Sequence, residues 1–579
     1  MTIKKVAVIG AGTMGSGIAG QVANAGVEVW LLDLPSNGTP NAFAARGLER
    51  LHESGGLVSR DSESHIHIGN TRDDLHQLVD CDWIAEAVVE RLDIKKDLYT
   101  QISEVCHDKA LISSNTSSIP IRLLVEDMPA SFRKRFAITH FFNPVRFMPL
   151  LELVRGDDTA QAVMDELSEF CDKQLGKGVI SCRDTPGFLG NRVGCYAIQC
   201  ALQAAVEMGL NPQQADAIFG RPMGIPKTGV FGLYDLIGID LMSDVVQSLV
   251  NNLPDTDAFH DEAGKVPLMV NMIANRQTGN KQGQGFYRIV EGARQVIDLA
   301  TGDYDKATRP QIPLALKAER DGVKVLLEDD GIYGKFAWRV LSRTLTYASS
   351  LIPEVGDDPL GVDDAMKLGY NWIKGPFELL DEIGVDYFIE RLTIEGREIP
   401  AFLQKAAGST FYRVGDSKTA GKQLKVRRFG GGWRVIKRPT GVARFNEMRR
   451  TLTPKLTCEV ASWFDVEDVA LVEFHSKANA LDGDSMAILA DAIDHVESAG
   501  MRGLVVHNDA QHFSCGVNLQ AVRDFFRAED MQGLDQFLMD FQDSVQRMAV
   551  AEFPVVCAPV GMSLGGGFEV VLHSKQVIC

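Results

Sequence analysis

A histidine and a glutamate twelve residues apart are the first pair in this sequence that could carry acid–base chemistry. His140 lies in an apolar run over residues 137–141, and Glu152 lies in the next run, over 150–154. If the two runs pair as an antiparallel hairpin centred near Arg146, the two side chains face each other. A carboxylate beside an imidazole fixes the ring tautomer and stabilises the cation, as a general base near neutral pH requires. A structural role is the alternative, so the surroundings of the pair must decide.

A glycine-rich segment near the start of the chain has the spacing of a dinucleotide-binding loop. Gly10–Gly15 directly follows the apolar run 6–9 and precedes a helical pattern, which places backbone amides and a helix dipole at one point. A second apolar run, 29–32, ends in Asp33, whose carboxylate can accept ribose hydroxyls and would repel a 2′-phosphate. The alternative is a structural turn with a capping aspartate. We expect an NAD site, in preference to NADP, formed by Gly10, Gly12, Thr13, Met14, Gly15 and Asp33.

Alternation of short apolar runs with helical stretches indicates the element that positions both features. The runs lie at residues 6–9, 29–32, 83–89, 110–113, 137–141 and 150–154. They predict a mostly parallel, doubly wound, Rossmann-like sheet in an α/β domain over residues 1–183. The pattern turns helical over 184–290. A second, related helical module is predicted over 330–400, because Phe231–Asp240 recurs as Phe377–Asp386 and Asp216-Ala217 recurs as Asp364-Ala365.

The remaining sequence divides into a basic segment and a second α/β region. Residues 401–455 carry basic side chains around Gly430–Gly432, and a solvated linker fits them better than the alternative, an anion-binding patch. Strand-like runs separated by helices then predict another α/β domain over 456–579. The basic residues are Lys422, Lys425, Arg427, Arg428, Arg434, Lys437 and Arg438.

Charge and cysteine content limit the partners and the location of the protein. The 59 basic and 77 acidic residues give a net charge of −18, which disfavours nucleic acid as the main partner. The ten cysteines form no Cys-x-x-Cys pair, so we expect reduced intracellular thiols and no metal site. The uncharged stretch 6–27 holds six glycines, which argues against a transmembrane segment or a signal peptide. We therefore expect a cytoplasmic protein.

Taken together, these segments resemble the L-3-hydroxyacyl-CoA dehydrogenase family. The resemblance extends from residue 1 to about residue 400, and its motifs are Gly10–Gly15, Ser114–Ser118, His140–Pro144, Glu152 and Gly187–Arg192. It implies NAD-dependent oxidation of an (S)-3-hydroxyacyl-CoA to the 3-oxoacyl-CoA, with His140 taking the hydroxyl proton and Glu152 orienting His140. Ser117 and Asn191 match the family's polar residues around the substrate oxygen and the imidazole; the alternatives are a loop hydroxyl and a polar residue at a helix N-terminus. Asn143 belongs to the same motif as His140, and Glu90 and Lys95 match positions on the cofactor side.

Two segments of the last region resemble the oxyanion segments of the crotonase family, which includes enoyl-CoA hydratases. They are Phe513–Leu519 and Gly561–Glu569. The resemblance implies that the amides of Val517 and Gly566 hold a thioester oxygen, and Glu569 matches one of the two glutamates by which a hydratase handles water. No second glutamate follows in this sequence, so we expect an incomplete crotonase-like domain with little hydratase activity. We also expect an exposed apolar strand edge near 555–571.

A hydratase and a dehydrogenase act on an acyl-CoA in consecutive steps, so the chain as a whole resembles a multifunctional enzyme of fatty-acid β-oxidation. The partners implied are an acyl-CoA thioester, a thiolase on another chain and a second copy of this chain, although the internal repeat could satisfy that last interface. Two alternatives stay open. The crotonase-like part could only bind acyl-CoA or serve for docking, or the whole chain could be a non-catalytic nucleotide-binding protein.

Overall fold

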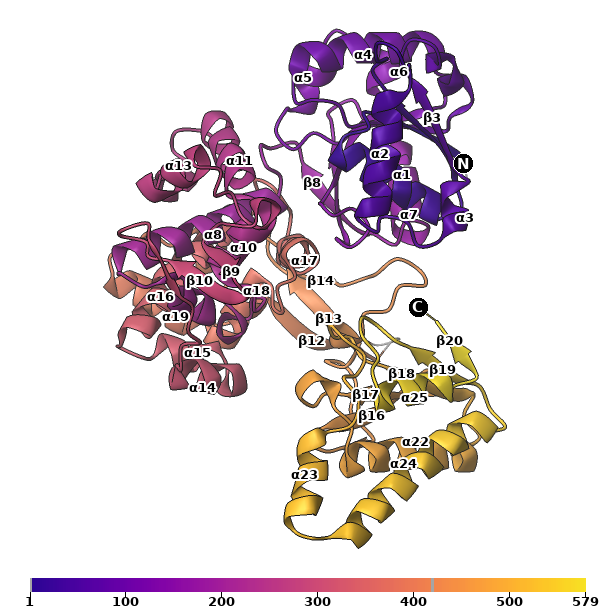
Figure 1. Ribbon diagram of the computed structural model, residues 1–579, viewed down its shortest axis with the longest axis vertical. Coiled ribbons are helices and arrows are strands. Elements are labelled where there is room, and N and C mark those ends of the chain that lie inside the picture. Colours follow the sequence, from indigo (N-terminus) through magenta and orange to yellow (C-terminus); the bar gives the residue numbers. More distant parts are fainter. Residues whose placement is uncertain (1–2, 418–420, 579) are drawn as a thin grey trace. The chain divides into compact units, whose positions relative to one another are not determined.

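The computed structural model describes residues 3–417 and 421–578 of the chain (Figure 1). The chain divides into two units. The first comprises Met1–Tyr412 and Val426–Trp433, and the second comprises Arg413–Lys425 and Arg434–Cys579. Within the described ranges, no helix combines the length and the apolar composition that crossing a membrane requires.

The first unit begins with the predicted doubly wound sheet, which has eight strands in the order β3-β2-β1-β4-β5-β6-β7-β8. All neighbouring strands are parallel except β6 and β7, which are antiparallel. The strand order reverses between β1 and β4, which is where sheets of this kind bind dinucleotides. The strands are β1 (Lys5–Ile9), β2 (Glu28–Asp33), β3 (Ile66–Asn70), β4 (Trp83–Glu86), β5 (Leu111–Ser114), β6 (Phe136–Phe141), β7 (Leu150–Arg155) and β8 (Gly178–Arg183).

The two strands that the apolar runs do not predict, β3 and β8, form the two edges of this sheet. Both carry polar side chains such as His67 and Arg183, so neither reads as an apolar run. Inner strands are buried, and Trp83 at the start of β4 donates its Nε1–H to the hydroxyl of Ser113 at 2.9 Å. The helices of this part are α1 (Thr13–Asn24), α2 (Ala42–Glu53), α3 (Arg60–Glu63), α4 (Leu92–Val105), α5 (Ile121–Val125), α6 (Ala130–Arg133) and α7 (Gln161–Lys173).

Two helical modules follow, and each is succeeded by a three-stranded sheet. The first consists of α8 (Gly190–Glu207), α9 (Pro212–Ile218), α10 (Gly229–Ile237), α11 (Ile239–Asn252), α12 (Phe259–Glu262), α13 (Pro267–Ala274), β9 (Tyr287–Val290), β10 (Ala293–Ile297) and β11 (Tyr304–Lys306). Two helices, α14 (Pro313–Asp321) and α15 (Val323–Leu327), lead to the second, with α16 (Ile332–Ser350), α17 (Pro359–Tyr370), α18 (Pro376–Ile383), α19 (Val385–Ile394), α20 (Ala401–Gln404), β12 (Tyr412–Ser417), β13 (Gly421–Arg427) and β14 (Trp433–Val435).

The segment that the sequence predicts as a linker, 401–455, therefore contains regular structure. It holds α20, the strands β12, β13 and β14, and the short helix α21 (Phe445–Met448). The strands alternate basic and apolar residues, as in Leu424, Lys425, Val426 and Arg427, with the apolar side chains buried. One face of such a sheet is solvated, which is why its composition resembles that of a linker.

A pair of aspartates ties each helical module to its small sheet. In the first module the Asp216 carboxylate accepts hydrogen bonds from the Phe231 amide at 2.7 Å and from the Tyr287 hydroxyl at 2.7 Å. Asp235 accepts from the amides of Phe286 and Tyr287, both at 2.7 Å. The carboxylates of the half-buried Asp216 and the buried Asp235 both bind the segment that begins β9, so they fix where that strand starts.

The second module repeats the arrangement, with one correction to the predicted alignment. Asp381 accepts from the amides of Phe411 and Tyr412 at 2.7 and 2.9 Å. The Tyr412 hydroxyl, however, donates to Asp363 at 2.7 Å, so the partner of Asp216 in the repeat is Asp363 and not the predicted Asp364. The repeat thus extends beyond residue 400, to the strand that follows Phe411.

The second unit has a six-stranded sheet in the order β15-β16-β17-β18-β19-β20. The prediction of an exposed apolar edge near 555–571 is wrong: β19 pairs with both β18 and β20, and Val555 and Val571 are buried. The elements are β15 (Leu456–Thr457), β16 (Ala461–Val466), β17 (Val469–Phe474), β18 (Gly503–His507), β19 (Val555–Ala558), β20 (Gln576–Val577), α22 (Gly483–Ala499), α23 (Leu519–Arg527), α24 (Met531–Val550) and α25 (Gly566–Leu572).

The aspartate pairs predict a pH-dependent stability. Burial raises the pKa of Asp216 from its ordinary 3.8 to about 7, in spite of the hydrogen bonds that it accepts. Between these two values the folded state holds a proton that the unfolded state has released, so stability falls as the pH rises. We expect the stability advantage of the wild type over Asp216→Asn to shrink between pH 4 and pH 7, by at most about 1.4 kcal/mol per pH unit. Thermal unfolding at several pH values measures it.

The exposed Asp108 supplies the matched control for this measurement. The stability difference between the wild type and Asp108→Asn should stay constant over the same pH range. A constant difference for Asp216→Asn as well would show that Asp216 titrates in the folded state as it does in the unfolded chain.

Candidate active site

The glycine segment after β1 packs against the end of β4, at the reversal point of the sheet. Gly10 has φ +104°, and a Cβ there would lie 2.5 Å from the carbonyl oxygen of Ala87. A Cβ at Gly15 would lie 1.7 Å from the carbonyl oxygen of Gly10. A Cβ at Gly12, in contrast, would have no atom within 4 Å. Two of the three glycines are therefore required for packing, and the third leaves open space.

The backbone amides beside this open space can donate hydrogen bonds to a pyrophosphate. Gly12 is the N-cap of α1, and within the described residues the amides of Gly12, Thr13 and Met14 donate to no acceptor. Unpaired amides at a helix start, with no side chain above the second glycine, form a site for a phosphate group. The predicted residues Gly10–Gly15 thus fit a bound dinucleotide.

Asp33, at the end of β2, adjoins this loop as predicted. Its carboxylate accepts from the amides of Ala11 and Leu34, both at 2.6 Å, and the side chain is partly exposed. The first of these bonds joins the end of β2 to the glycine loop, so the carboxylate lies beside the loop that would hold the pyrophosphate. A negative charge there favours ribose hydroxyls over a 2′-phosphate.

On the other side of the glycine loop, after β4, lies the pair Glu90 and Lys95. Lys95 is buried, with its Nζ 2.7 Å from Glu86 and 3.3 Å from Glu90. Glu90 is 41% exposed and also accepts from the hydroxyls of Thr116 and Ser118. Burial raises its pKa, but the attraction of Lys95 and these hydrogen bonds outweigh burial and lower the pKa below its usual value. Glu90 therefore presents a carboxylate anion beside the predicted cofactor site.

The sequence does not identify Glu86, which organises this corner. Its carboxylate is fully buried and accepts from Lys95, the Tyr99 hydroxyl and the Ser114 hydroxyl, the last two at 2.6 Å, and from the Val88 amide at 2.7 Å. The tyrosine hydroxyl stays protonated because burial, followed by the charge of Glu86, raises its pKa well above 10. Glu86 thus fixes Lys95, and through it Glu90.

His140 and Glu152 face each other across β6 and β7, as the sequence predicts. The two residues are register partners, and Nδ1 of His140 lies 2.7 Å from Oε2 of Glu152. Glu152 is fully buried and His140 is 7% exposed. A neutral imidazole in this arrangement keeps its proton on Nδ1, because the Nδ1–H group donates a hydrogen bond to the carboxylate. Nε2 has no partner among the described residues and is free to accept a proton.

The other oxygen of Glu152 binds the start of α8. Oε1 accepts from the amides of Leu189 and Gly190 at 2.9 and 2.7 Å. These amides lie at the N-terminal end of a helix, where an anion is favoured. The same carboxylate therefore orients His140 and attaches the first helical module to the sheet.

The remaining predicted residues lie on segments that these bonds bring together. Ser117 follows β5, its carbonyl accepts from the Gly187 amide at 3.2 Å, and its hydroxyl has no partner within the described ranges. Asn191 is the second residue of α8, directly after Gly190. Asn143 lies just beyond β6 with an exposed side chain. A residue to which the sequence assigns no role, Asn115, accepts from the Phe141 amide at 2.9 Å and so holds the end of β6.

Comparisons with known proteins agree with this geometry. Residues 5–185 match the model of the 3-hydroxyacyl-CoA dehydrogenase NAD-binding domain, and residues 187–289 match that of the 3-hydroxyacyl-CoA dehydrogenase C-terminal domain. A Bacillus subtilis protein named "Probable 3-hydroxyacyl-CoA dehydrogenase" is 31% identical in an alignment of 604 positions, gaps included, that covers 99% of this chain and 75% of that protein. The chain belongs to the 3-hydroxyacyl-CoA dehydrogenase family.

Two further similarities extend over different parts of the chain. A Rickettsia prowazekii protein named as a fatty acid oxidation complex trifunctional enzyme is 31% identical over 100% of this chain and 77% of its own length. The crystal structure of 3-hydroxybutyryl-CoA dehydrogenase from Escherichia coli K12 covers 70% of this chain and 98% of that chain, with 25% identity and a TM-score of 0.54. This dehydrogenase family thus accounts for the NAD-binding sheet and the helical part.

The C-terminal unit of this dehydrogenase-family chain brings the two predicted oxyanion segments together. A Cβ at Gly566 would lie 3.0 Å from a methyl carbon of Val517. Neither the Val517 amide nor the Gly566 amide donates to an acceptor within the described residues. Glu569 lies on α25 with an exposed side chain. Two unpaired amides on touching loops can bind an oxyanion.

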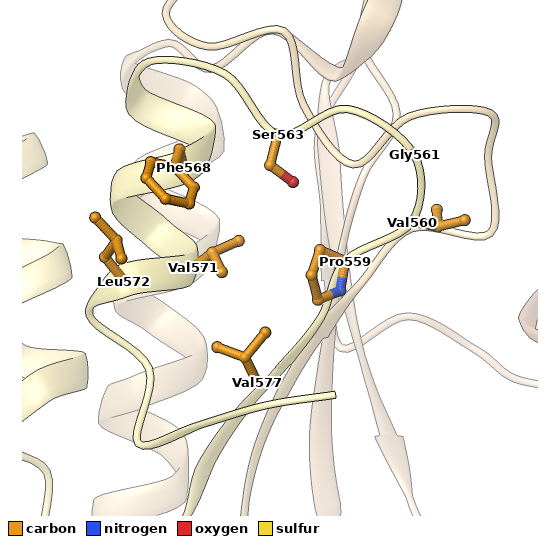
Figure 2. A pocket seen from close by; sticks show the side chains of 8 residues that line it. All are labelled: Pro559, Val560, Gly561, Ser563, Phe568, Val571, Leu572 and Val577. Carbon is orange, nitrogen blue, oxygen red and sulfur yellow. The ribbon is translucent and has the colours of Figure 1, made fainter. Parts of the chain in front are cut away.

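An apolar pocket lies between α25 and the strands beside it. Figure 2 shows its lining, in which Phe568, Val571 and Leu572 extend from the helix and Val577 lies opposite. The pocket has a volume of about 700 Å³. Its remaining lining residues are Pro559 and Val560, which follow β19, and Gly561 and Ser563, which belong to the second oxyanion segment.

The two kinds of glycine in the N-terminal loop should behave differently when changed to alanine. Gly15→Ala should lower both the unfolding temperature and the affinity for NAD, because its Cβ would clash with the Gly10 carbonyl. Gly12→Ala should leave the unfolding temperature unchanged but weaken NAD binding about tenfold or more, since the methyl group occupies the space for the pyrophosphate. Thermal unfolding and NAD titration measure the two effects.

Gly483→Ala is the control, because a Cβ there also has no neighbour within 4 Å and lies far along the chain, on α22. It should change neither quantity. Unweakened binding of NAD to Gly12→Ala would contradict this position for the pyrophosphate.

Proposed function

We propose that the chain oxidises (S)-3-hydroxyacyl-CoA thioesters to 3-oxoacyl-CoA with NAD as the acceptor. The observation that carries the proposal is the buried His140–Glu152 pair, whose imidazole Nε2 has no partner among the described residues. The pair lies in the same sheet as β1, and the loop after β1 leads to the unpaired amides of Gly12, Thr13 and Met14. Membership of the dehydrogenase family and the similarity to the Bacillus subtilis relative support it. NAD supplies the hydride acceptor when it is bound.

Proton transfer is the task of His140. Its Nε2 accepts the proton of the 3-hydroxyl group as the carbon–hydrogen bond at C3 is broken, and the imidazole becomes a cation. Glu152 lies 2.7 Å from Nδ1, so the new charge forms beside a fixed carboxylate. The carboxylate is held by the α8 amides and cannot turn away.

The polar residues around the pair would bind the substrate and the cofactor. Ser117 and Asn191 offer a hydroxyl and an amide that can hydrogen-bond to the 3-oxygen, and Asn143 lies at the end of the strand that carries His140. On the cofactor side, the anionic Glu90 can accept hydroxyl groups of the nicotinamide ribose, with Lys95 holding it in place. Asp33 selects NAD over NADP.

Removal of the imidazole should abolish the reaction. We expect the wild type to form NADH from NAD and (S)-3-hydroxybutyryl-CoA, and His140→Gln to lower kcat by about 10²–10⁴-fold, because glutamine cannot take up the proton. NADH absorbance measures the rate. The exposed His76 gives the control His76→Gln, which should keep the wild-type rate. Absence of NADH formation by the wild type, or an unchanged rate in His140→Gln, would contradict proton transfer to His140.

A second, crotonase-like function is favoured by the two unpaired amides of Val517 and Gly566. They can hold the thioester oxygen of an acyl-CoA as it gains charge. Glu569 is exposed on α25, the helix that begins at Gly566. Hydration of an enoyl-CoA uses an acid and a base, and this carboxylate can serve as one of them.

Removal of this carboxylate should slow the hydration of an enoyl-CoA. We expect Glu569→Gln to lower the hydration rate by about 10²–10⁴-fold, since it removes a general acid or base. Loss of enoyl-CoA absorbance gives the rate. An unchanged hydration rate in Glu569→Gln would contradict a catalytic role for this residue.

The proposed reaction also suggests partners and a location. The 3-oxoacyl-CoA product is a substrate for thiolytic cleavage, so a thiolase on another chain is part of the proposal. We also propose that the chain associates with a second copy of itself. A cytoplasmic location is proposed because all the cysteines that the structure describes are free thiols.

A further inference from the structure

The second helical module contacts β7, the strand that carries Glu152, and α8, whose first amides bind the Glu152 carboxylate. Its helix α17 packs against β7, β8 and α8. A Cβ at Gly369, on α17, would lie 2.5 Å from the side chain of Leu150 at the start of β7. The Arg183 amide at the end of β8 donates to the Val355 carbonyl at 3.2 Å. The second module is thus in direct contact with the catalytic part of the sheet.

At the end of α17, Tyr370 extends this contact to a substrate-side residue. Its hydroxyl donates to Oδ1 of Asn191 at 3.3 Å and lies 3.9 Å from the sulfur of Cys195. A Cβ at Gly194 would be 2.1 Å from the tyrosine ring, so this position of α8 has to be glycine for the ring to fit. The ring also meets Phe142, two residues beyond His140, edge to face at 6.4 Å between centroids.

The protonation states around Tyr370 fix the direction of these hydrogen bonds. Burial raises the pKa of Tyr370 well above 10, and the neighbouring Cys195 and Glu152 raise it further. Burial likewise raises the pKa of the Cys195 thiol to about 12. Both groups therefore keep their protons near neutral pH. The thiol can donate to the tyrosine oxygen while the tyrosine donates to Asn191.

This hydrogen bond decides which end of the Asn191 amide is available to a substrate. An asparagine side chain has an acceptor oxygen and a donor nitrogen, and a half-turn exchanges them. Because Oδ1 is taken by Tyr370, the donor Nδ2 is the free end, and it has no partner within the described residues. A donor is what an oxygen needs as it changes from hydroxyl to carbonyl after losing its proton to His140.

We propose that Tyr370 is a positioning residue of the dehydrogenase site, which holds the Asn191 amide with its nitrogen toward the 3-oxygen of the substrate. The second helical module thereby completes the active site of the first. This inference rests on the proposed dehydrogenase function and adds a residue to it that lies 179 positions from Asn191 in the sequence.

A double-mutant cycle tests whether Tyr370 acts through Asn191. Tyr370→Phe keeps the ring and removes only the hydroxyl. With Asn191 present, it should lower kcat about fivefold, the value of a hydrogen bond of roughly 1 kcal/mol, and leave the KM for NAD unchanged. In an Asn191→Ala background the same change should alter kcat by less than about twofold, because the group that it positions is absent.

The pattern of kinetic effects separates positioning from a structural role. Tyr412→Phe is the matched control, since it removes a tyrosine hydroxyl bonded to Asp363 in the same module. It should lower the unfolding temperature and leave kcat unchanged. With a substrate deuterated at C3, Tyr370→Phe should show a larger isotope effect on kcat than the wild type, since the chemical step becomes slower, whereas Tyr412→Phe should not.

Two outcomes would overturn the proposal: an unchanged kcat in Tyr370→Phe, or an equal loss in the presence and absence of the Asn191 side chain. Failure of the proposed function itself looks different, because His140→Gln would then keep its activity. An inactive His140→Gln together with a fully active Tyr370→Phe removes the role of Tyr370 alone.

Discussion

The carboxylate of Glu152 is the group on which the arrangement of the site depends. One oxygen accepts from the imidazole of His140 and the other accepts from two amides at the start of α8. A fully buried anion is stable only when every oxygen is satisfied, and here the partners come from a strand of the sheet and from the first helical module. The same carboxylate therefore orients the imidazole for proton transfer and attaches the first helical module to the sheet.

Much of this arrangement follows from the sequence because it is local. The glycine loop, Asp33 and the facing of His140 and Glu152 depend on strands that are adjacent in the chain or marked by long apolar runs. The strand register confirms that last expectation directly. The doubly wound sheet is confirmed as well, because its inner strands are buried on both faces and read as unbroken apolar stretches.

Two kinds of structural feature could not be predicted from the sequence. The edge strands β3 and β8 and the small sheets after each helical module alternate polar and apolar residues over only a few positions, so they resemble loops or linkers. The partners of Glu86 and the bond from Tyr370 to Asn191 depend on packing between distant segments, and neither leaves a local pattern. The sequence shows the repeat, but a one-residue difference in spacing conceals the equivalence of Asp216 with Asp363. The structure establishes that equivalence, because each of the two carboxylates accepts a hydrogen bond from a tyrosine hydroxyl.

The aspartate pairs of the two modules also bear on the order in which the chain acquires its structure. The hydrogen bonds from the tyrosine hydroxyls lie within single modules: Asp216 accepts from Tyr287 across 71 positions, and Asp363 accepts from Tyr412 across 49. During synthesis, the first module can therefore close its small sheet before the second has left the ribosome. The contact of Tyr370 with α8 comes later, so the last step that assembles the dehydrogenase site is the docking of an already folded module onto a nearly finished enzyme.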